Sequence, residues 1–277
     1  MDLNKFVELA IAEDIRDGDH TSLACIPAGQ TSRAKLLVKD NGILAGVEVA
    51  EALFRGIDPE LQLEILLKDG AEVKYGDVAF YVTGSARNIL MAERLVLNMM
   101  QRMSGVATVT NKFVKAVEGT KAKILDTRKT TPLLRQFEKI AVRIGGGVNH
   151  RFGLFDMIMI KDNHIAYAGG VEQAITSVQK YLNDNNLRLK IEIEAGSLEQ
   201  VQQILDIGGI DRIMIDNFSP QGAKEAVALI GGRYETEVSG GIVLDNVRSY
   251  AESGCDFISV GSLTHSVKSL DLSLKAV

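Results

Sequence analysis

The stretch LKIEIEAGSLEQVQQILDIGGIDRIMID, residues 189–216, decides the fold. Two short apolar runs, at 189–194 and 211–216, enclose a helical pattern at 197–206. Two strands joined by a helical crossover run parallel, whereas a tight turn would make them antiparallel. The stretch therefore predicts one βα unit of a parallel sheet.

The same alternation extends in both directions from about residue 121. Further strand-like runs fall at 122–126, 155–161, 234–239 and 257–261. Further helical patterns fall at 132–143, 171–182, 220–230 and 244–252. The later spacing is regular, with 23 residues from Asp216 to Ser239 and 22 from Ser239 to Gly261. We expect an α/β barrel related to the TIM type, or an incomplete version of it. No GxGxxG follows the first strand, which argues against a dinucleotide-binding fold.

The first third of the chain mixes helices and strands. Helical patterns fall near 3–13, 46–56, 85–105 and 106–117. Strand-like runs fall at 31–39, 42–45, 61–67 and 78–82. This order predicts an α+β domain with an antiparallel sheet and helices on one face.

The composition is that of a folded, soluble protein. Of 277 residues, 46% are apolar and 24% are charged, with a net charge of −5, which excludes disordered, collagen-like and coiled-coil classes. No apolar run approaches the ~18 residues of a membrane helix. The opening MDLNKFVELAIAED predicts an amphipathic helix rather than a signal peptide. Cys25 and Cys255 lie far apart, which favours reduced, buried thiols in a cytoplasmic protein.

The charge is unevenly distributed. Residues 94–161 hold 13 basic and four acidic side chains, a local charge of +9, which leaves −14 for the rest. A basic middle in an acidic protein suggests an anion site, although a solvated basic helix face would give the same count. Nucleic acid is a weaker interpretation, because the basic residues form no single run and no aromatic side chains are interleaved as a platform.

Every predicted barrel strand ends in polar or glycine residues. In chain order these ends are 126–129, 161–164, 192–194, 216–217, 239–241 and 261–262. Active sites of βα barrels are built at this rim, because the loops there converge on one mouth. One such ending would reflect ordinary turn chemistry, but all six together favour a functional site.

Three groups of rim residues suggest specific ligands. Ser239-Gly240-Gly241 and Gly261-Ser262 can expose main-chain amides to a phosphate. Glu194 and Asp216 can hold Mg²⁺ through water or accept ribose hydroxyls, or they can pair structurally with Lys161 or Arg128. The glycine-rich loop 145–153 contains His150 and Arg151, and we expect it to bind a carboxylate.

These motifs together resemble the quinolinate phosphoribosyltransferase family. The resemblance rests on EDIRDGDHTS, AERLVLNMMQRMSGVAT, DTRKTTPLLR, EKIAVRIGGGVNHRFGLFDMIMIKDNH, IEIEAGSLEQ, IDNF, VSGG and VGSLTHS, which run from about residue 13 to residue 266. One departure is Leu133, which stands where many members have glycine.

The resemblance implies an N-terminal α+β sandwich domain over residues 1–108. It implies a C-terminal incomplete TIM-like α/β barrel over 109–277, whose extreme C-terminal tail packs back on the N-terminal domain. It further implies a homodimer or higher homo-oligomer with shared active sites, binding quinolinate and phosphoribosyl pyrophosphate, with Mg²⁺ as cofactor and no nucleic acid or membrane partner.

The resemblance also implies roles for individual residues. The quinolinate-binding set is Arg128, Lys129, His150, Arg151 and Lys161, with Arg94 supplied by the partner chain. The residues facing the phosphoribosyl group are Glu194 and Asp216, which also face Mg²⁺, and Ser239, Gly240, Gly241, Gly261 and Ser262. The residues implied to be catalytic are Lys129, Lys161, Glu194 and Asp216.

Three other readings stay open on sequence alone. The enzyme could act on another acidic heterocycle, it could be a barrel lyase that uses Lys161 as a Schiff-base amine, or it could bind a polyanion without turnover.

Overall fold

A computed structural model describes residues 2–277, which divide into two compact units. The first unit takes the chain up to Asn111 together with Thr131–Gly146 and Ser266–Val277. The second unit takes Lys112–Thr130 and Gly147–His265. Within residues 2–277, every helix is either too short or too polar to span a lipid bilayer.

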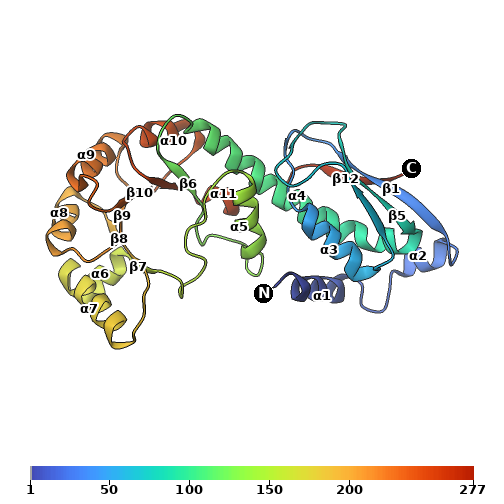
Figure 1. Cartoon of the computed structure of the whole chain (residues 1–277), viewed down its shortest axis with the longest axis horizontal. Coiled ribbons are helices and arrows are strands. Elements are labelled where there is room, and N and C mark those ends of the chain that lie inside the picture. The colour runs from blue at the N-terminus through green and yellow to red at the C-terminus, as the bar shows by residue number, and fades with distance from the viewer. Residues whose placement is uncertain (1) are drawn as a thin grey trace. The chain divides into compact units, whose positions relative to one another are not determined.

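The first unit is built on a four-stranded antiparallel sheet in the order β12-β1-β5-β3 (Figure 1). Its strands are β1 (Thr31–Val38), β3 (Gln62–Ile65), β5 (Val78–Ser85) and β12 (Leu272–Ala276), and a separate pair is formed by β2 (Gly42–Ile43) and β4 (Glu72–Val73). Alternate residues of β1 are buried, as expected for a strand with one face on a core.

The first unit also contains helices. They are α1 (Leu3–Asp14), α2 (His20–Cys25), α3 (Val47–Ile57), the long α4 (Ala86–Ala116), which continues into the second unit, and α5 (Arg135–Ile144). The apolar face of α3 packs on β5, where the rings of Phe54 and Phe80 meet edge to face with centroids 6.0 Å apart. Cys25 is exposed at the end of α2, so the expectation that both cysteines are buried is wrong for this residue, whereas Cys255 is buried.

The sequence predicted two successive helices at 85–105 and 106–117, and this boundary is wrong. The structure has one continuous helix, α4, across Ser104 and Gly105. A glycine inside a helix is unfavourable on propensity alone. Here a side chain at Gly105 would overlap the main-chain oxygen of Lys268, so the missing Cβ allows the C-terminal segment to pack closely on the helix.

The second unit is a six-stranded parallel sheet in the order β6-β11-β10-β9-β8-β7. Its strands are β6 (Lys123–Leu125), β7 (Ile158–Ile160), β8 (Ile191–Ala195), β9 (Arg212–Asp216), β10 (Glu235–Ser239) and β11 (Phe257–Ser259). The first strand in sequence pairs with the last, as in a barrel, but β6 and β7 do not pair. All six predicted strands are present, and the prediction of an incomplete TIM-like barrel is confirmed.

Four helices form an outer layer around these strands (Figure 1): α7 (Val171–Asp184), α8 (Leu198–Ile207), α9 (Pro220–Ile230) and α10 (Leu244–Ala251). Two short helices, α6 (Asp162–Ala168) and α11 (Ser262–His265), directly follow β7 and β11. Local sequence sets their starts: the side chains of Ser197 and Ser219 cap α8 and α9, and Pro220 takes the first turn of α9. The sequence did not predict α6, which begins where β7 ends.

The sequence prediction placed one domain boundary, between residues 108 and 109. In the structure α5, which follows the first barrel strand, belongs to the first unit because Phe137 packs on Phe6 at 4.4 Å and Glu138 pairs with Arg102 at 2.7 Å. The C-terminal strand β12 also belongs to the first unit, since it pairs with β1. The barrel is therefore formed by two separate stretches of chain.

Candidate active site

The carboxyl ends of all six barrel strands border one cavity of about 810 Å³ in the second unit. The lining residues at these ends are Thr127, Arg128, Lys129, Lys161, Glu194, Asp216, Asn217, Ser239, Gly240, Gly241, Gly261 and Ser262. His150 and Arg151 line the same cavity. The structure thus brings together every predicted site residue except Arg94.

Arg128 and Arg151 give the cavity its cationic side. The Nε atoms of both side chains are buried without a hydrogen-bond partner among residues 2–277, and neither guanidinium has a carboxylate within 4.0 Å there. Arg151 Nη1 donates to the main-chain oxygen of Met157 at 3.0 Å. Burial and the neighbouring charge of Arg128 lower the pKa of Arg151. Two neighbouring cations that form no ion pair with a carboxylate among residues 2–277 suit an anionic ligand.

Glu194 and Asp216 lie on the neighbouring strands β8 and β9 and bring negative charge to the cavity. Glu194 accepts from Lys161 Nζ at 2.8 Å and from the main-chain N–H of Asp162 at 3.1 Å. The structural pairing considered from sequence therefore exists for Glu194. Burial and the negative charge of Glu194 raise the pKa of Asp216. Two adjacent oxygen donors whose charges repel fit a hard divalent cation.

The loops after β10 and β11 bring small residues to the cavity. Gly240 has φ +98° and Gly241 has φ +62°, both in the region that favours glycine. A side chain at Gly240 would overlap Asn217, and one at Gly261 would lie 3.1 Å from Lys129 Cδ. Glycine is therefore required at Gly240 both by the backbone and by the space, and the main chain stays open to a ligand.

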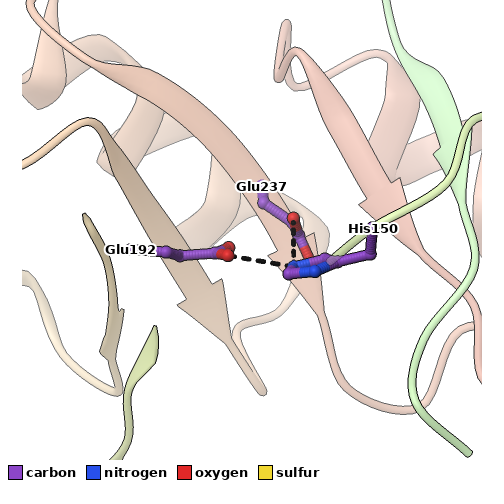
Figure 2. Close-up of side chains that lie close together, drawn as sticks. All are labelled: His150, Glu192 and Glu237. Atoms are coloured by element: carbon purple, nitrogen blue, oxygen red, sulfur yellow. Dashed lines mark ion pairs between the residues drawn. The ribbon is translucent and has the colours of Figure 1, made fainter. Parts of the chain in front are cut away.

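His150 forms part of the cavity floor, with only 4% of its side chain exposed. Its main-chain N–H donates to Asp126 Oδ1 at 2.8 Å. As Figure 2 shows, its Nε2 points at two buried carboxylates, 2.9 Å from Glu192 Oε2 and 3.4 Å from Glu237 Oε2. Burial disfavours a charged ring, but the two carboxylates outweigh burial and raise the pKa of His150 to about 9.

A second contact acts on the other side of the same ring. The main-chain N–H of Arg151 donates to His150 Nδ1 at 2.6 Å, which requires a lone pair on Nδ1 and so opposes the rise in pKa. A neutral ring with its proton on Nε2 and its lone pair on Nδ1 makes both contacts at once. These two contacts fix the orientation of the ring.

Sequence reasoning missed three residues at this site. Glu192 and Glu237 are fully buried, and His265 lines the cavity beside Gly261. The alternation of side chains along a strand could have indicated the two glutamates. Glu192 lies two positions before Glu194, and Glu237 lies two positions before Ser239, so each shares a strand face with a predicted site residue.

Arg94 lies elsewhere. It is exposed on α4 in the first unit and is not among the residues that line the cavity. Its expected role concerns a second chain, so it stays a prediction.

Comparison with known proteins gives matches across the whole chain. The family model described as quinolinate phosphoribosyl transferase, C-terminal domain, matches residues 106–275, and the model of the N-terminal domain matches residues 19–104. The mitochondrial quinolinate phosphoribosyltransferase [decarboxylating] 2b of Nicotiana tabacum is 47% identical over 99% of this chain and 82% of its own length. A probable nicotinate-nucleotide pyrophosphorylase [carboxylating] of Bacillus subtilis is 41% identical over 99% of this chain and 93% of its own length.

Solved structures agree with these matches. The crystal structure of NadC from Streptococcus pyogenes superposes with a TM-score of 0.93 at 38% identity, covering 99% of this chain and 97% of that one. Both family models, the relatives and the fold therefore coincide with the resemblance seen in the motifs. The chain belongs to the quinolinate phosphoribosyltransferase family.

Proposed function

We propose that this protein joins quinolinate to phosphoribosyl pyrophosphate and releases nicotinate mononucleotide, pyrophosphate and carbon dioxide, a step of de novo NAD biosynthesis. The observation that supports the proposal is the set of groups that line one cavity. Arg128 and Arg151, the acid-binding side, form no ion pair with a carboxylate among residues 2–277, which suits the two carboxylates of quinolinate. The same cavity is lined by Glu194, Asp216 and glycine loops, which suit a sugar with phosphates and a cation.

The chemistry explains why no nucleophile–base pair is needed. The pyridine nitrogen of quinolinate has a free lone pair and attacks C1 of the ribose, while the bond from C1 to pyrophosphate breaks. Arg128 and Arg151 hold the carboxylates so that the nitrogen faces this carbon, which is catalysis by positioning and charge stabilisation. Lys161 lies at the rim, with its Nζ 2.8 Å from Glu194 Oε1.

Magnesium fits the acidic side of the cavity. Glu194 and Asp216 offer the oxygen donors that this ion prefers, and burial together with the neighbouring charge of Glu194 raises the pKa of Asp216, so a cation would stabilise both carboxylates. Held by these two residues through water, Mg²⁺ would neutralise charge on the pyrophosphate group.

Loss of carbon dioxide follows from the first step. Once the pyridine nitrogen carries the ribose it is cationic, so it accepts the electron pair left when the adjacent carboxylate leaves. The carbanion at that ring carbon then takes a proton. Exclusion of water by the buried floor around His150 favours this step.

We further propose that the enzyme is a cytoplasmic homodimer in which Arg94 of one chain completes the cavity of the other. The exposure of Arg94 on α4 is compatible with this role. Such an arrangement would add a third arginine to the acid-binding side.

One assay tests the proposed function. Purified protein is incubated with Mg²⁺, phosphoribosyl pyrophosphate and quinolinate, and mononucleotide and carbon dioxide are measured. We expect both products in equal amounts, and their loss when a chelator removes the metal and their return when Mg²⁺ is restored. Nicotinate, which lacks the second carboxylate, is the matched control substrate and should react poorly. Faster turnover of another acidic heterocycle would contradict the assignment of quinolinate.

A further inference from the structure

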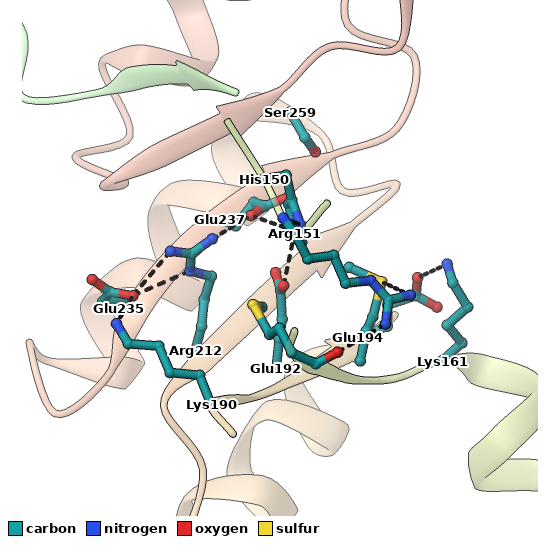
Figure 3. A network of polar contacts seen from close by, with 12 residues as sticks. His150, Arg151, Lys161, Lys190, Glu192, Glu194, Arg212, Glu235, Glu237 and Ser259 are labelled. Atoms are coloured by element: carbon teal, nitrogen blue, oxygen red, sulfur yellow. Dashed lines mark hydrogen bonds and ion pairs between the residues drawn. The ribbon is translucent and has the colours of Figure 1, made fainter. Parts of the chain in front are cut away.

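A network of charged side chains lies inside the barrel (Figure 3), and two of its members, His150 and Glu237, also line the cavity. Glu192 comes from β8, Arg212 from β9 and Glu237 from β10, three strands that lie side by side in the sheet. His150 enters from the segment that precedes β7. Glu192 and Glu237 are 0% exposed, so their charges depend on neighbouring side chains rather than on water.

The two carboxylates share the His150 ring, but only Glu237 also pairs with Arg212. Arg212 Nη1 donates to Glu237 Oε2 at 2.9 Å, and the same guanidinium also reaches Glu235 at 3.0 Å. Glu192 has a different partner: both of its oxygens are buried without a hydrogen bond among residues 2–277, and its ion pair is with His150 Nε2 at 2.9 Å. Removing the Glu192 carboxylate would therefore act on the His150 ring first.

The ring passes this constraint on to the acid-binding side. His150 Nδ1 accepts the main-chain N–H of Arg151, the next residue, at 2.6 Å. Arg151 is a cavity-lining cation whose Nε has no partner among the described residues. The contacts thus form a chain from Glu192 through the imidazole to the main chain of Arg151.

We propose that Glu192 is a positioning residue for the acid-binding side of the cavity. Its carboxylate fixes the orientation of the His150 ring, and the ring fixes the main chain of Arg151, whose guanidinium then meets the substrate carboxylate in one geometry. This inference rests on the proposed function, because it needs an acid as the ligand of Arg151. Indirect partners of this kind matter because a small misplacement of a binding group costs much of its effect.

The same three side chains could suit a metal ion, since ligand atoms of His150, Glu192 and Glu237 lie within 4.8 Å of one another. One contact argues against a metal ion. Arg212 Nη1 already lies 2.9 Å from Glu237 Oε2 and supplies a positive charge there, whereas the 2.9 Å contact from His150 Nε2 to Glu192 is an ion pair that lacks hydrogen-bond geometry. A second cation among these groups would have to displace or repel the guanidinium.

The experiment compares Glu192→Ala and Glu192→Gln with Glu235→Gln as the matched control. Glu235 also contacts Arg212, but its carboxylate is 39% exposed and it does not reach His150. We expect Glu192→Ala to raise the KM for quinolinate at least about tenfold, with less than about a twofold change in the KM for phosphoribosyl pyrophosphate. Glu192→Gln keeps an oxygen for the Nε2 proton and should restore much of the quinolinate KM. Glu235→Gln should behave as the wild type.

Other outcomes overturn the inference. Equal rises in both KM values, or a fall in kcat alone, would show a general structural role. Stoichiometric metal in the purified wild type that is lost in Glu192→Ala would show a metal site. If Glu192→Ala does not fold, two other measurements decide. The inference is overturned if Glu192→Gln leaves the KM for quinolinate unchanged and the nitrogen NMR spectrum of the wild type shows no proton on His150 Nε2. Failure of the proposed function is seen separately, as absence of turnover of quinolinate by the wild type.

Discussion

Arg128 and Arg151 each keep a buried Nε without a partner in the described chain, whereas Arg212, on β9, pairs with Glu235 and Glu237. The three arginines occupy one barrel but differ in what faces them. Partial burial of a cation that forms no ion pair costs free energy, and binding of an anion offsets this cost. The difference separates arginines that stabilise the barrel from those positioned for a ligand.

Replacement of Arg151 by alanine tests this distinction. We expect Arg151→Ala to weaken binding of quinolinate by about 2–5 kcal/mol, because a buried carboxylate loses its charged partner. Binding of phosphoribosyl pyrophosphate should change much less. Calorimetric titration of each ligand measures both effects. Lys123→Ala removes one positive charge from the exposed start of β6 and should change neither affinity; equal weakening of both ligands by Arg151→Ala would contradict the assignment.

Leu133 has a backbone conformation that is unusual for a residue with a side chain. Its φ of +67° lies in the region that favours glycine. Its side chain is 78% exposed, so it meets no steric obstacle from packing. The cost is therefore confined to the backbone, of the order of 1–2 kcal/mol.

Secondary-structure elements are joined by specific polar contacts as well as by the sheet. Asp256, just before β11, accepts the main-chain N–H and the hydroxyl of Thr236 on β10 at 2.9 and 2.8 Å. Lys121 Nζ lies 3.0 Å from the same carboxylate. Burial opposes the charge, but the bonds from Thr236 and Lys121 outweigh it and lower the pKa of Asp256.

This contact predicts a pH dependence of stability. The folded state holds the Asp256 proton less tightly than the unfolded state, so the contact stabilises the protein above the ordinary pKa of the carboxyl. That contribution is lost as the pH falls through the lowered pKa. Asp256→Asn should therefore be less stable than the wild type at neutral pH, and the difference should shrink in acid. Urea unfolding at several pH values measures this, with Asp245→Asn, at an exposed position, as control. A difference in the free energy of unfolding between Asp256→Asn and the wild type that does not change with pH would contradict the prediction.

The long helix α4 depends on close packing at Gly105. Gly105→Ala should lower the free energy of unfolding, because the new Cβ overlaps the main-chain oxygen of Lys268. This clash opposes the gain of about 1 kcal/mol that alanine brings to an exposed helix position. Asn98→Ala, at an exposed position of the same helix, is the matched control and should be neutral or slightly stabilising. Thermal unfolding of both variants measures the effect, and stabilisation by Gly105→Ala would show that the C-terminal segment packs differently.

At the scale of the whole molecule, the units do not follow the order of the sequence. Residues 131–146 and 266–277 leave the barrel and join the first unit. Within the barrel, β6 and β7 consequently stay unpaired with each other, and the chain between Gly147 and Met157 carries His150 and Arg151 to the cavity. The absence of a regular crossover at this point is what frees these two residues for the site.

Mixing of inactive chains tests the shared site. Arg94→Ala and Lys161→Ala should each be inactive alone. After subunit exchange in an equal mixture, about a quarter of wild-type activity should return, because half of the dimers hold one cavity with both native residues. Verified subunit exchange without recovery of activity would contradict the proposal that Arg94 acts on the partner chain. The control replaces one of the two chains by a chain that carries both Arg94→Ala and Lys161→Ala, and recovery of activity in that mixture would point to an artefact.

The sequence by itself determined the fold class, the six parallel strands and the residues at their carboxyl ends, because these follow from local periodicity and from strand-to-helix spacing. It also indicated Arg128, Arg151, Glu194 and Asp216 as site residues, because each stands in a short continuous motif. Only the tertiary structure decided where α5 belongs, that α4 is continuous, and that Glu192 lies against His150. These outcomes depend on contacts between residues far apart in sequence, such as Phe6 with Phe137, Gly105 with Lys268, and Glu192 with His150. Local patterns do not encode such contacts, because the same helix or strand preference is compatible with many partners.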